Sequence, residues 1–210
     1  MKSNLEEENE KISISDIRDS FNIVLMGDSS VGKTSILERY CNNFFKTEKY
    51  QRKTIEIYKK FVTFSEFSYQ VKFWDAPNFI DNCNDSEINM FHNCDGIIYV
   101  CSYDNKDSLT HINTWYQFLT QYIDLSTKEM ILLINKKDLK EGKVITEEQI
   151  DKKSKDLQLE YYEISAKTGE CVFKGIQSII KKLVERCNER SRGSHNNNIN
   201  EKEKGGCIII

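Results

Sequence analysis

Several features of membrane-spanning and secreted proteins are missing from this chain of 210 residues. No apolar run approaches the roughly 18–20 residues needed to cross a bilayer. The longest runs, Gly96–Cys101 and Met130–Ile134, have the length of a strand. The N-terminus is polar and acidic, without the basic start and apolar centre of a signal peptide. We therefore expect neither a membrane-spanning nor a secreted protein.

Cysteine and charge patterns exclude further classes. The seven cysteines are scattered, odd in number and include no Cys-x-x-Cys pair, which argues against a disulfide framework and a zinc site. The chain holds 30 basic and 33 acidic residues, and the acidic excess lies in residues 1–20. Because the remainder is balanced in charge, we expect no nucleic-acid partner.

Composition divides the chain into three regions. Residues 1–19 are acidic and polar, and we expect a disordered extension there. Residues 20–187 carry the periodic apolar patterns of one folded domain. Residues 188–210 are predicted to form a flexible, low-complexity tail.

Inside the folded region, apolar runs typical of strands alternate with segments of helical spacing. The expected strands are 21–26, 60–64, 69–74, 96–101 and 130–134, and the expected helices begin near Ser35, Ser108 and Val172. Segments 60–64 and 69–74 flank a short turn and predict an antiparallel hairpin. Strands joined by crossover helices predict an α/β fold, with a mainly parallel sheet, helices on both faces and a ligand at the carboxyl ends of the strands.

The segment Gly27–Thr34 reads Gly-Asp-Ser-Ser-Val-Gly-Lys-Thr and lies between an expected strand and an expected helix. This pattern is a phosphate-binding P-loop, in which glycines let backbone N–H groups turn toward an anion. The helix N-terminus adds positive potential at the same place. Lys33 is expected to reach the β- and γ-phosphates of a nucleotide, and the Thr34 hydroxyl to bind Mg²⁺. Lys33 is thus a candidate catalytic residue.

Two later segments bear on which base is bound. Asn135-Lys-Lys-Asp138 follows a buried strand, and the Asp138 carboxylate can accept two N–H bonds from guanine where adenine offers none. Asn135 supplies an amide suited to the opposite edge of the base. Ser165-Ala166-Lys167 follows another strand-like stretch and is weak by itself. The pair of segments favours guanine over adenine and disfavours an ATP-dependent enzyme.

The P-loop, Trp74-Asp75, Asn135–Asp138 and Ser165–Thr168 occur in an order and at separations that resemble the Ras superfamily of small GTPases, most closely its Rab branch. The resemblance covers residues 20–187. It implies a P-loop NTPase fold with a mostly parallel six-stranded sheet and one antiparallel edge strand, and it implies GTP or GDP bound with Mg²⁺. The implied nucleotide-binding residues are Gly27, Asp28, Ser29, Ser30, Val31, Gly32, Lys33, Thr34, Ser35, Phe45, Asn135, Lys136, Asp138, Ser165, Ala166 and Lys167.

Individual roles follow from the same resemblance. The Ala166 N–H would contact the guanine O6, and Lys136 and Lys167 would pack over the base. Phe45 matches the position of the aromatic ring that stacks on guanine, although a loop aromatic tucked into the core is the alternative. Asp75 would hold Mg²⁺ through its water shell.

The second switch segment departs from the family pattern Asp-Thr-Ala-Gly-Gln, because here it reads Asp75-Ala-Pro-Asn-Phe79. The glycine that binds the γ-phosphate falls on Pro77, which has no N–H, or on Asn78. The glutamine that orients the attacking water falls on Asn78 or Phe79. Asn78 is therefore a candidate catalytic residue, and we expect slow hydrolysis.

The first switch segment has two possible alignments. Thr54-Ile-Glu matches the family's Thr-Ile-Gly and makes Thr54 a ligand of Mg²⁺. An alignment without gaps places Arg52 at the same position. The favoured alignment is the one with Thr54.

The last four residues, Cys207-Ile-Ile-Ile, fit a C-a-a-X prenylation box, and the bulky aliphatic end resembles the geranylgeranyl type. A single lipid gives only marginal anchoring. Acidic residues dilute the few basic residues of the preceding tail, so the tail is a poor polybasic patch. We therefore expect a lipid on Cys207 to attach the protein to membranes reversibly, and a prenyl-binding carrier to bind the protein when it is detached.

The resemblance implies a Rab-like switch in membrane traffic on the cytoplasmic face of endomembranes, with a cytosolic pool bound to the carrier. An exchange factor, an activating protein and effectors would act through the switch segments. The alternative is a GTP-bound adaptor that does not hydrolyse.

Overall fold

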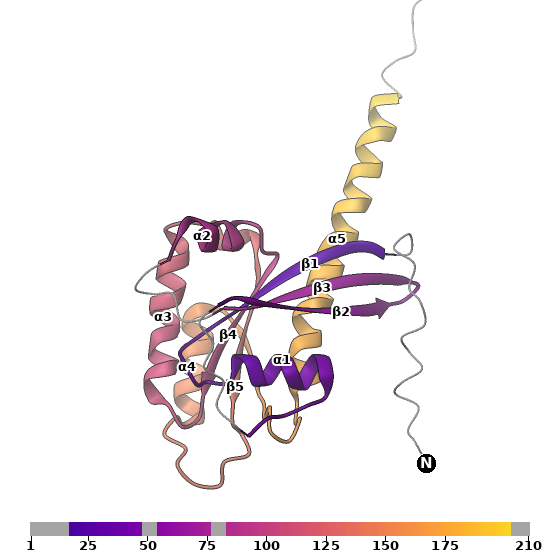
Figure 1. The fold of residues 1–210 in the computed structure, drawn as a ribbon. Helices are drawn as coiled ribbons and strands as arrows, with labels where there is room; N and C mark the ends of the chain where they lie inside the picture. The colour runs from indigo at the N-terminus through magenta and orange to yellow at the C-terminus, as the bar shows by residue number, and fades with distance from the viewer. Residues whose placement is uncertain (1–16, 48–53, 77–82, 203–210) are drawn as a thin grey trace, which may run out of the picture.

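The computed structural model describes residues 17–47, 54–76 and 83–202, with side chains described as far as Ser191. Strands and helices alternate along most of the chain (Figure 1). The elements are β1 (Ile17–Met26), α1 (Lys33–Asn42), β2 (Glu56–Phe64), β3 (Phe67–Asp75), α2 (Asp85–His92), β4 (Gly96–Ser102), α3 (Lys106–Thr120), the 3₁₀ turn η2 (Leu125–Thr127), β5 (Glu129–Asn135), α4 (Glu147–Leu157), β6 (Glu160–Glu163) and α5 (Val172–Lys202).

Six strands form one sheet in the order β2-β3-β1-β4-β5-β6. The hairpin of β2 and β3 is antiparallel, with Glu56 opposite Asp75 and Phe64 opposite Phe67. The other neighbouring strands are parallel. β4 is buried along its whole length, as its unbroken apolar sequence predicts. The predicted α/β fold with one antiparallel edge strand is confirmed.

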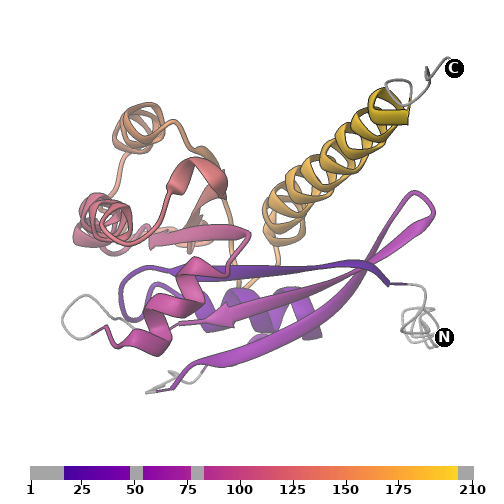
Figure 2. The same ribbon diagram turned by 90° about the horizontal axis from the view of Figure 1, so that it is seen from above.

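Helices cover both faces of the sheet (Figures 1 and 2). α1 and α5 pack on one face around side chains such as Ile36 and Ile176. α2, α3 and α4 pack on the other face around Phe91, Trp115 and Ile150. Apolar packing on both faces holds the parallel strands in register, so that the carboxyl ends of β1, β3, β4 and β5 lie at one end of the sheet.

The structure adds two helices that the apolar pattern did not predict. α4 buries a single apolar residue, Ile150, so its periodicity is weak. α2 and α4 both begin at a capping box, formed by Asn84 with Glu87 and by Thr146 with Gln149. The cap is therefore the local sequence signal that predicts them.

Two element bounds differ from the predicted regions. β1 begins at Ile17, because pairing with β3 extends the strand beyond its apolar core. α5 continues to Lys202, beyond residue 188, where the sequence predicts a flexible tail; eight of the fifteen residues from 188 to 202 are Asn, Ser or Gly, which disfavour a helix. Although α5 is 31 residues long, the described part of the chain holds no helix with both the length and the apolarity to cross a membrane.

Candidate nucleotide site

The P-loop begins directly after β1, and close packing explains both of its outer glycines. A Cβ on Gly27, which has a φ of +146°, would lie 2.1 Å from the Val100 carbonyl oxygen. A Cβ on Gly32, which has a φ of +99°, would lie 2.3 Å from Nδ2 of Asn135. Gly32 is the N-cap of α1 and provides no side-chain cap. The first turn of α1 therefore offers its N–H groups to an anion.

Lys33 is buried within this loop, with 8% of its surface exposed. Its Nζ donates to the carbonyl oxygens of Gly27, at 2.7 Å, and Asp28, at 2.9 Å. Burial lowers the pKa of Lys33, whereas the nearby carboxylates of Asp75 and Asp28 act to raise it. A buried ammonium group held by carbonyl oxygens gains charge compensation from an anion such as a nucleotide phosphate.

Thr34 and Asp75 bring hard oxygen atoms together at the end of the sheet. Thr34 Oγ1 donates to Asp75 Oδ2 at 2.5 Å, and Asp75 is 4% exposed. One hydroxyl and one carboxylate at the phosphate end of a nucleotide site are the donor set that fits Mg²⁺, which otherwise keeps water and phosphate ligands. Thr54 is exposed shortly before β2 and makes no hydrogen bond to either residue within the described segments. Its role as a metal ligand stays a prediction.

Asn135 joins the P-loop to the loop after β6. Its Nδ2 donates to the Val31 carbonyl oxygen at 2.9 Å, and its Oδ1 accepts from the Ala166 N–H at 3.0 Å. Asn135 is 2% exposed. In this structure the Asn135 amide and the Ala166 N–H, both expected at the base, bond within the protein. These two hydrogen bonds hold the P-loop and the loop after β6 at a fixed separation.

Asp138 lies at the solvent-facing side of the two loops that Asn135 joins. Ser165 Oγ donates to Asp138 Oδ1 at 2.6 Å, and Lys167 Nζ lies 3.9 Å from Asp138 Oδ2. The Asp138 side chain is 16% exposed. A carboxylate oriented by a buried hydroxyl is a fixed acceptor, and such an acceptor selects a ligand by its N–H donors.

Lys136 forms an ion pair at the edge of the site, and its expected packing over the base stays a prediction. Its Nζ donates to both carboxylate oxygens of Asp104, at 2.8 and 2.9 Å. Asp104 follows the end of β4, so the pair joins the loops after two neighbouring strands. Hydrogen bonds from Lys136 and Ser102 lower the pKa of Asp104 against the opposing effect of burial.

Sequence reasoning missed Arg39, Asp104 and His111. Arg39 extends from α1 and donates through Nε to the Ala166 carbonyl oxygen and through Nη2 to the Lys167 carbonyl oxygen, both at 2.9 Å. None of the three residues belongs to a motif, and each meets its partner only in the folded chain. A weak signal existed for Asp104, which follows the end of an expected strand.

The remaining candidates lie around the loop. Ser29 and Ser30 are exposed and Ser35 is partly buried. Phe45 is partly buried against the core beneath α1 and α5. This placement matches the alternative in which the ring packs into the core. The neighbouring Phe44 is 52% exposed. The described residues do not include Arg52, Pro77, Asn78, Phe79 or Cys207.

A sequence profile of the Ras family matches residues 22–185. The chain is 28% identical to the Ras-related protein Rab-1 of Theileria parva over 167 residues, which cover 79% of this chain and 75% of that protein. It is 25% identical to the Ras-related protein Rab-9A of Rattus norvegicus over 167 residues, 78% of this chain and 83% of that protein. It is 29% identical to the Ras-related protein RabG2 of Dictyostelium discoideum over 153 residues, 72% of this chain and 76% of that protein. The profile match includes the P-loop, Asn135–Asp138 and Ser165–Lys167.

Proposed function

The chain belongs to the Ras family, as a Rab-like small GTPase, and from this premise we propose that it is a guanine-nucleotide-dependent switch in membrane traffic. It binds GTP and GDP with Mg²⁺ and hydrolyses GTP slowly. The observation that carries the proposal is the pair of hydrogen bonds made by the buried Asn135 amide. They join the P-loop to the loop after β6, which we expect to face the base.

The phosphate end of the site is built for charge neutralisation. Lys33 and the first turn of α1 compensate the charge on the β- and γ-phosphates. Thr34 and Asp75 hold Mg²⁺, which supplies further positive charge beside the phosphates when it is bound. Phosphoryl transfer in such sites depends on positioning and electrostatic stabilisation rather than on covalent chemistry by the protein.

The base end selects guanine through Asp138. The carboxylate accepts from the N1–H and the 2-amino group of guanine, and adenine lacks both donors. Ser165 orients the carboxylate, and Lys167 partly compensates its charge. An adenine nucleotide would leave a partly buried carboxylate without its bonds, which costs several kcal/mol and disfavours ATP by about 100-fold or more.

Slow hydrolysis follows from the second switch segment. Intrinsic hydrolysis by Ras, which has the water-orienting glutamine, proceeds at only about 3–5 × 10⁻⁴ s⁻¹. This chain places asparagine or phenylalanine at that position, and Pro77 removes an N–H if it takes the place of the glycine. We therefore expect a protein that spends most of its time bound to GTP, until a partner supplies catalytic groups.

Membrane attachment and partners complete the proposal. A geranylgeranyl group on Cys207 would attach the protein to the cytoplasmic face of endomembranes, and a prenyl-binding carrier would hold a cytosolic pool. Switch segments ordered by the γ-phosphate would present the GTP state to effectors, an exchange factor and an activating protein.

The test begins with the nucleotide that co-purifies with the full chain, identified by chromatography after denaturation. We expect GTP or GDP. Competition for the emptied site should then rank GTP and GDP far above ATP, and single-turnover hydrolysis of labelled GTP should be slower than in Ras. Equal competition by ATP would refute the nucleotide assignment.

The hydrolysis assay is repeated with cell extract to distinguish a switch that cycles between GTP and GDP from an adaptor that does not hydrolyse GTP. Acceleration by extract indicates an activating partner and a protein that cycles. No hydrolysis under either condition, with guanine nucleotide still bound, would leave the non-hydrolysing adaptor as the function.

A further inference from the structure

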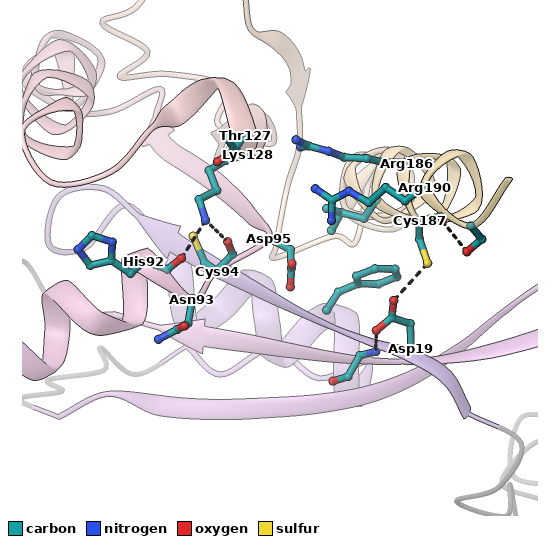
Figure 3. A pocket seen from close by; sticks show the side chains of 14 residues that line it. Asp19, His92, Asn93, Cys94, Asp95, Thr127, Lys128, Arg186, Cys187 and Arg190 are labelled. Atoms are coloured by element: carbon teal, nitrogen blue, oxygen red, sulfur yellow. Dashed lines mark hydrogen bonds between the residues drawn. The ribbon is translucent and has the colours of Figure 1, made fainter. Parts of the chain in front are cut away.

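A cavity of about 420 Å³ lies at the end of the sheet opposite the P-loop. Ser20 and Phe21 line it from the first half of β1, Asp95 from the residue before β4, and Lys128 from the residue before β5. The amino ends of three parallel strands therefore form its floor, whereas the nucleotide site lies at their carboxyl ends. α5 closes one side of the cavity (Figure 3). Its volume is within the range of ligand pockets.

Lys128 supplies a fixed positive charge to this cavity. Its Nζ donates to the carbonyl oxygens of His92, at 2.9 Å, and Cys94, at 2.7 Å. Among the described residues, no carboxylate forms an ion pair with Lys128. Two backbone bonds hold the ammonium group in place, and the carboxylates of Asp95 and Asp124 interact with it electrostatically without forming an ion pair.

Two arginines from α5 face the same cavity. Arg186 and Arg190 are one helical turn apart, and Figure 3 shows both extending from the helix toward the side that holds Lys128 and Asp95. Arg186 contacts Glu129 at 3.3 Å through Nη1. A guanidinium group has five N–H donors, so the bond to Glu129 leaves Arg186 further donors for an anion.

The cavity also offers hydrogen-bond acceptors and a hydroxyl group. Asp95 Oδ2 accepts from the Asn22 N–H at 2.8 Å, and burial raises the pKa of Asp95. Ser20 Oγ is buried and has no hydrogen-bond partner among the described residues. A buried hydroxyl without a partner, beside a poorly solvated carboxylate, suits a ligand that brings hydroxyl groups of its own.

We propose that this cavity binds a phosphorylated polyol, the head group of an inositol phospholipid. The cations of Lys128, Arg186 and Arg190 take the phosphate groups, while Asp95 and Ser20 bond to ring hydroxyls. Three cations and two carboxylates line the cavity, so the lining matches a ligand that carries both phosphates and hydroxyls better than a bare anion.

The route of the chain points to a lipid as the source of this head group. α5 lines the cavity as far as Ser191 and leads toward Cys207, so the cavity lies on the part of the domain from which the proposed anchor departs. This step rests on the proposed membrane function. One prenyl chain gives marginal membrane binding and stable attachment needs a second signal, which a head-group site supplies.

The experiment uses the full chain loaded with GDP and Mg²⁺. Isothermal titration compares inorganic phosphate with inositol bisphosphate, the soluble head group of phosphatidylinositol monophosphate. Flotation of protein expressed in eukaryotic cells compares phosphatidylcholine vesicles with and without that lipid. We expect saturable binding of inositol bisphosphate, weaker binding of phosphate, and greater recruitment by vesicles that contain the lipid.

Variants separate the cavity from general charge. Arg190→Gln, on an exposed position of α5, should weaken inositol bisphosphate binding about tenfold or more, because a bond to a charged group is lost. Lys128→Gln should do the same. Lys181→Gln removes one charge from the same helix outside the cavity, where Lys181 pairs with Glu185, and should leave binding unchanged.

Several outcomes would overturn the inference. They are no saturable binding of inositol bisphosphate, an equal loss in Lys181→Gln, or binding of the soluble head group without any added recruitment to lipid vesicles. Retention of fluorescent GDP by each variant shows that the fold is intact. If the wild-type chain binds no guanine nucleotide, the titration is made on the unloaded chain, with circular dichroism to check the fold; saturable head-group binding there would refute the proposed function alone.

Discussion

His111 Nδ1 lies 2.7 Å from Asp28 Oδ2 and joins α3 to the P-loop. The Asp28 side chain is 12% exposed, whereas that of His111 is 46% exposed. The second carboxylate oxygen, Asp28 Oδ1, is buried and has no hydrogen-bond partner among the described residues. The imidazole of His111 is thus the side chain that hydrogen-bonds to a buried carboxylate within the phosphate-binding loop.

Replacing His111 by alanine should speed the release of GDP. The variant removes the hydrogen bond between His111 and the Asp28 carboxylate beside the nucleotide phosphates, at a cost of about 1–1.5 kcal/mol, or roughly five- to tenfold in dissociation rate. Release of a fluorescent GDP analogue into excess GDP measures the rate. Asn113→Ala, an exposed change on the same helix, is the control. Equal rates in wild type and His111→Ala would contradict the role of this contact.

Gly27→Ala should abolish nucleotide binding. The new Cβ would overlap the Val100 carbonyl oxygen, which lies 2.1 Å from its position, so β4 or the loop must move. Gly142→Ala is the matched control, because Gly142 also has a positive φ, +78°, but no atom within 4 Å of the added Cβ. The control should lose only about 1–2 kcal/mol of stability and keep its affinity for GDP. Thermal denaturation and nucleotide titration on both variants check this.

Asp138→Asn should change the base that is bound. The asparagine amide donates where the carboxylate accepted, which suits the C2 carbonyl of xanthine. We expect affinity for GTP to fall by about 100-fold and preference to shift to xanthosine triphosphate. Competition binding measures both. A variant that still prefers GTP would show that another group reads the base.

Glutamine substitutions in the second switch segment should identify the residue that occupies the position of the family's glutamine. Asn78→Gln adds one methylene, and Phe79→Gln replaces a side chain that cannot orient water. We expect one of the two, and not both, to accelerate single-turnover hydrolysis several-fold, because a preorganised contact to the attacking water is restored. If neither variant hydrolyses GTP faster, slow hydrolysis has another cause, such as a missing N–H at Pro77.

Cys207→Ser should release the protein from membranes without changing nucleotide binding, since the lipid supplies most of the membrane affinity. Fractionation of eukaryotic cells measures the distribution. Mass spectrometry of the wild-type protein should find a geranylgeranyl group on Cys207. An unmodified Cys-Ile-Ile-Ile terminus in the membrane fraction would argue against this anchor.

Local patterns predicted most of the strands and the longest helices. Gly96–Cys101 and Met130–Ile134 are apolar without interruption, because β4 and β5 have helices on both faces. Local signals were weaker where burial is small. α4 buries only Ile150, so its capping box predicts the helix better than its apolar pattern does.

The sequence by itself determined the P-loop, the segments Asn135–Asp138 and Ser165–Lys167, and the α/β fold, because spacing and apolar period are local properties of the chain. Tertiary structure decided how the side chains are used. The Asn135 amide bonds to the P-loop and to Ala166, and Lys136 bonds to Asp104. Arg39 meets Ala166 across 127 positions of sequence, and His111 meets Asp28 across 83. No local pattern records such contacts, because only the packing of helices against the sheet brings their atoms together.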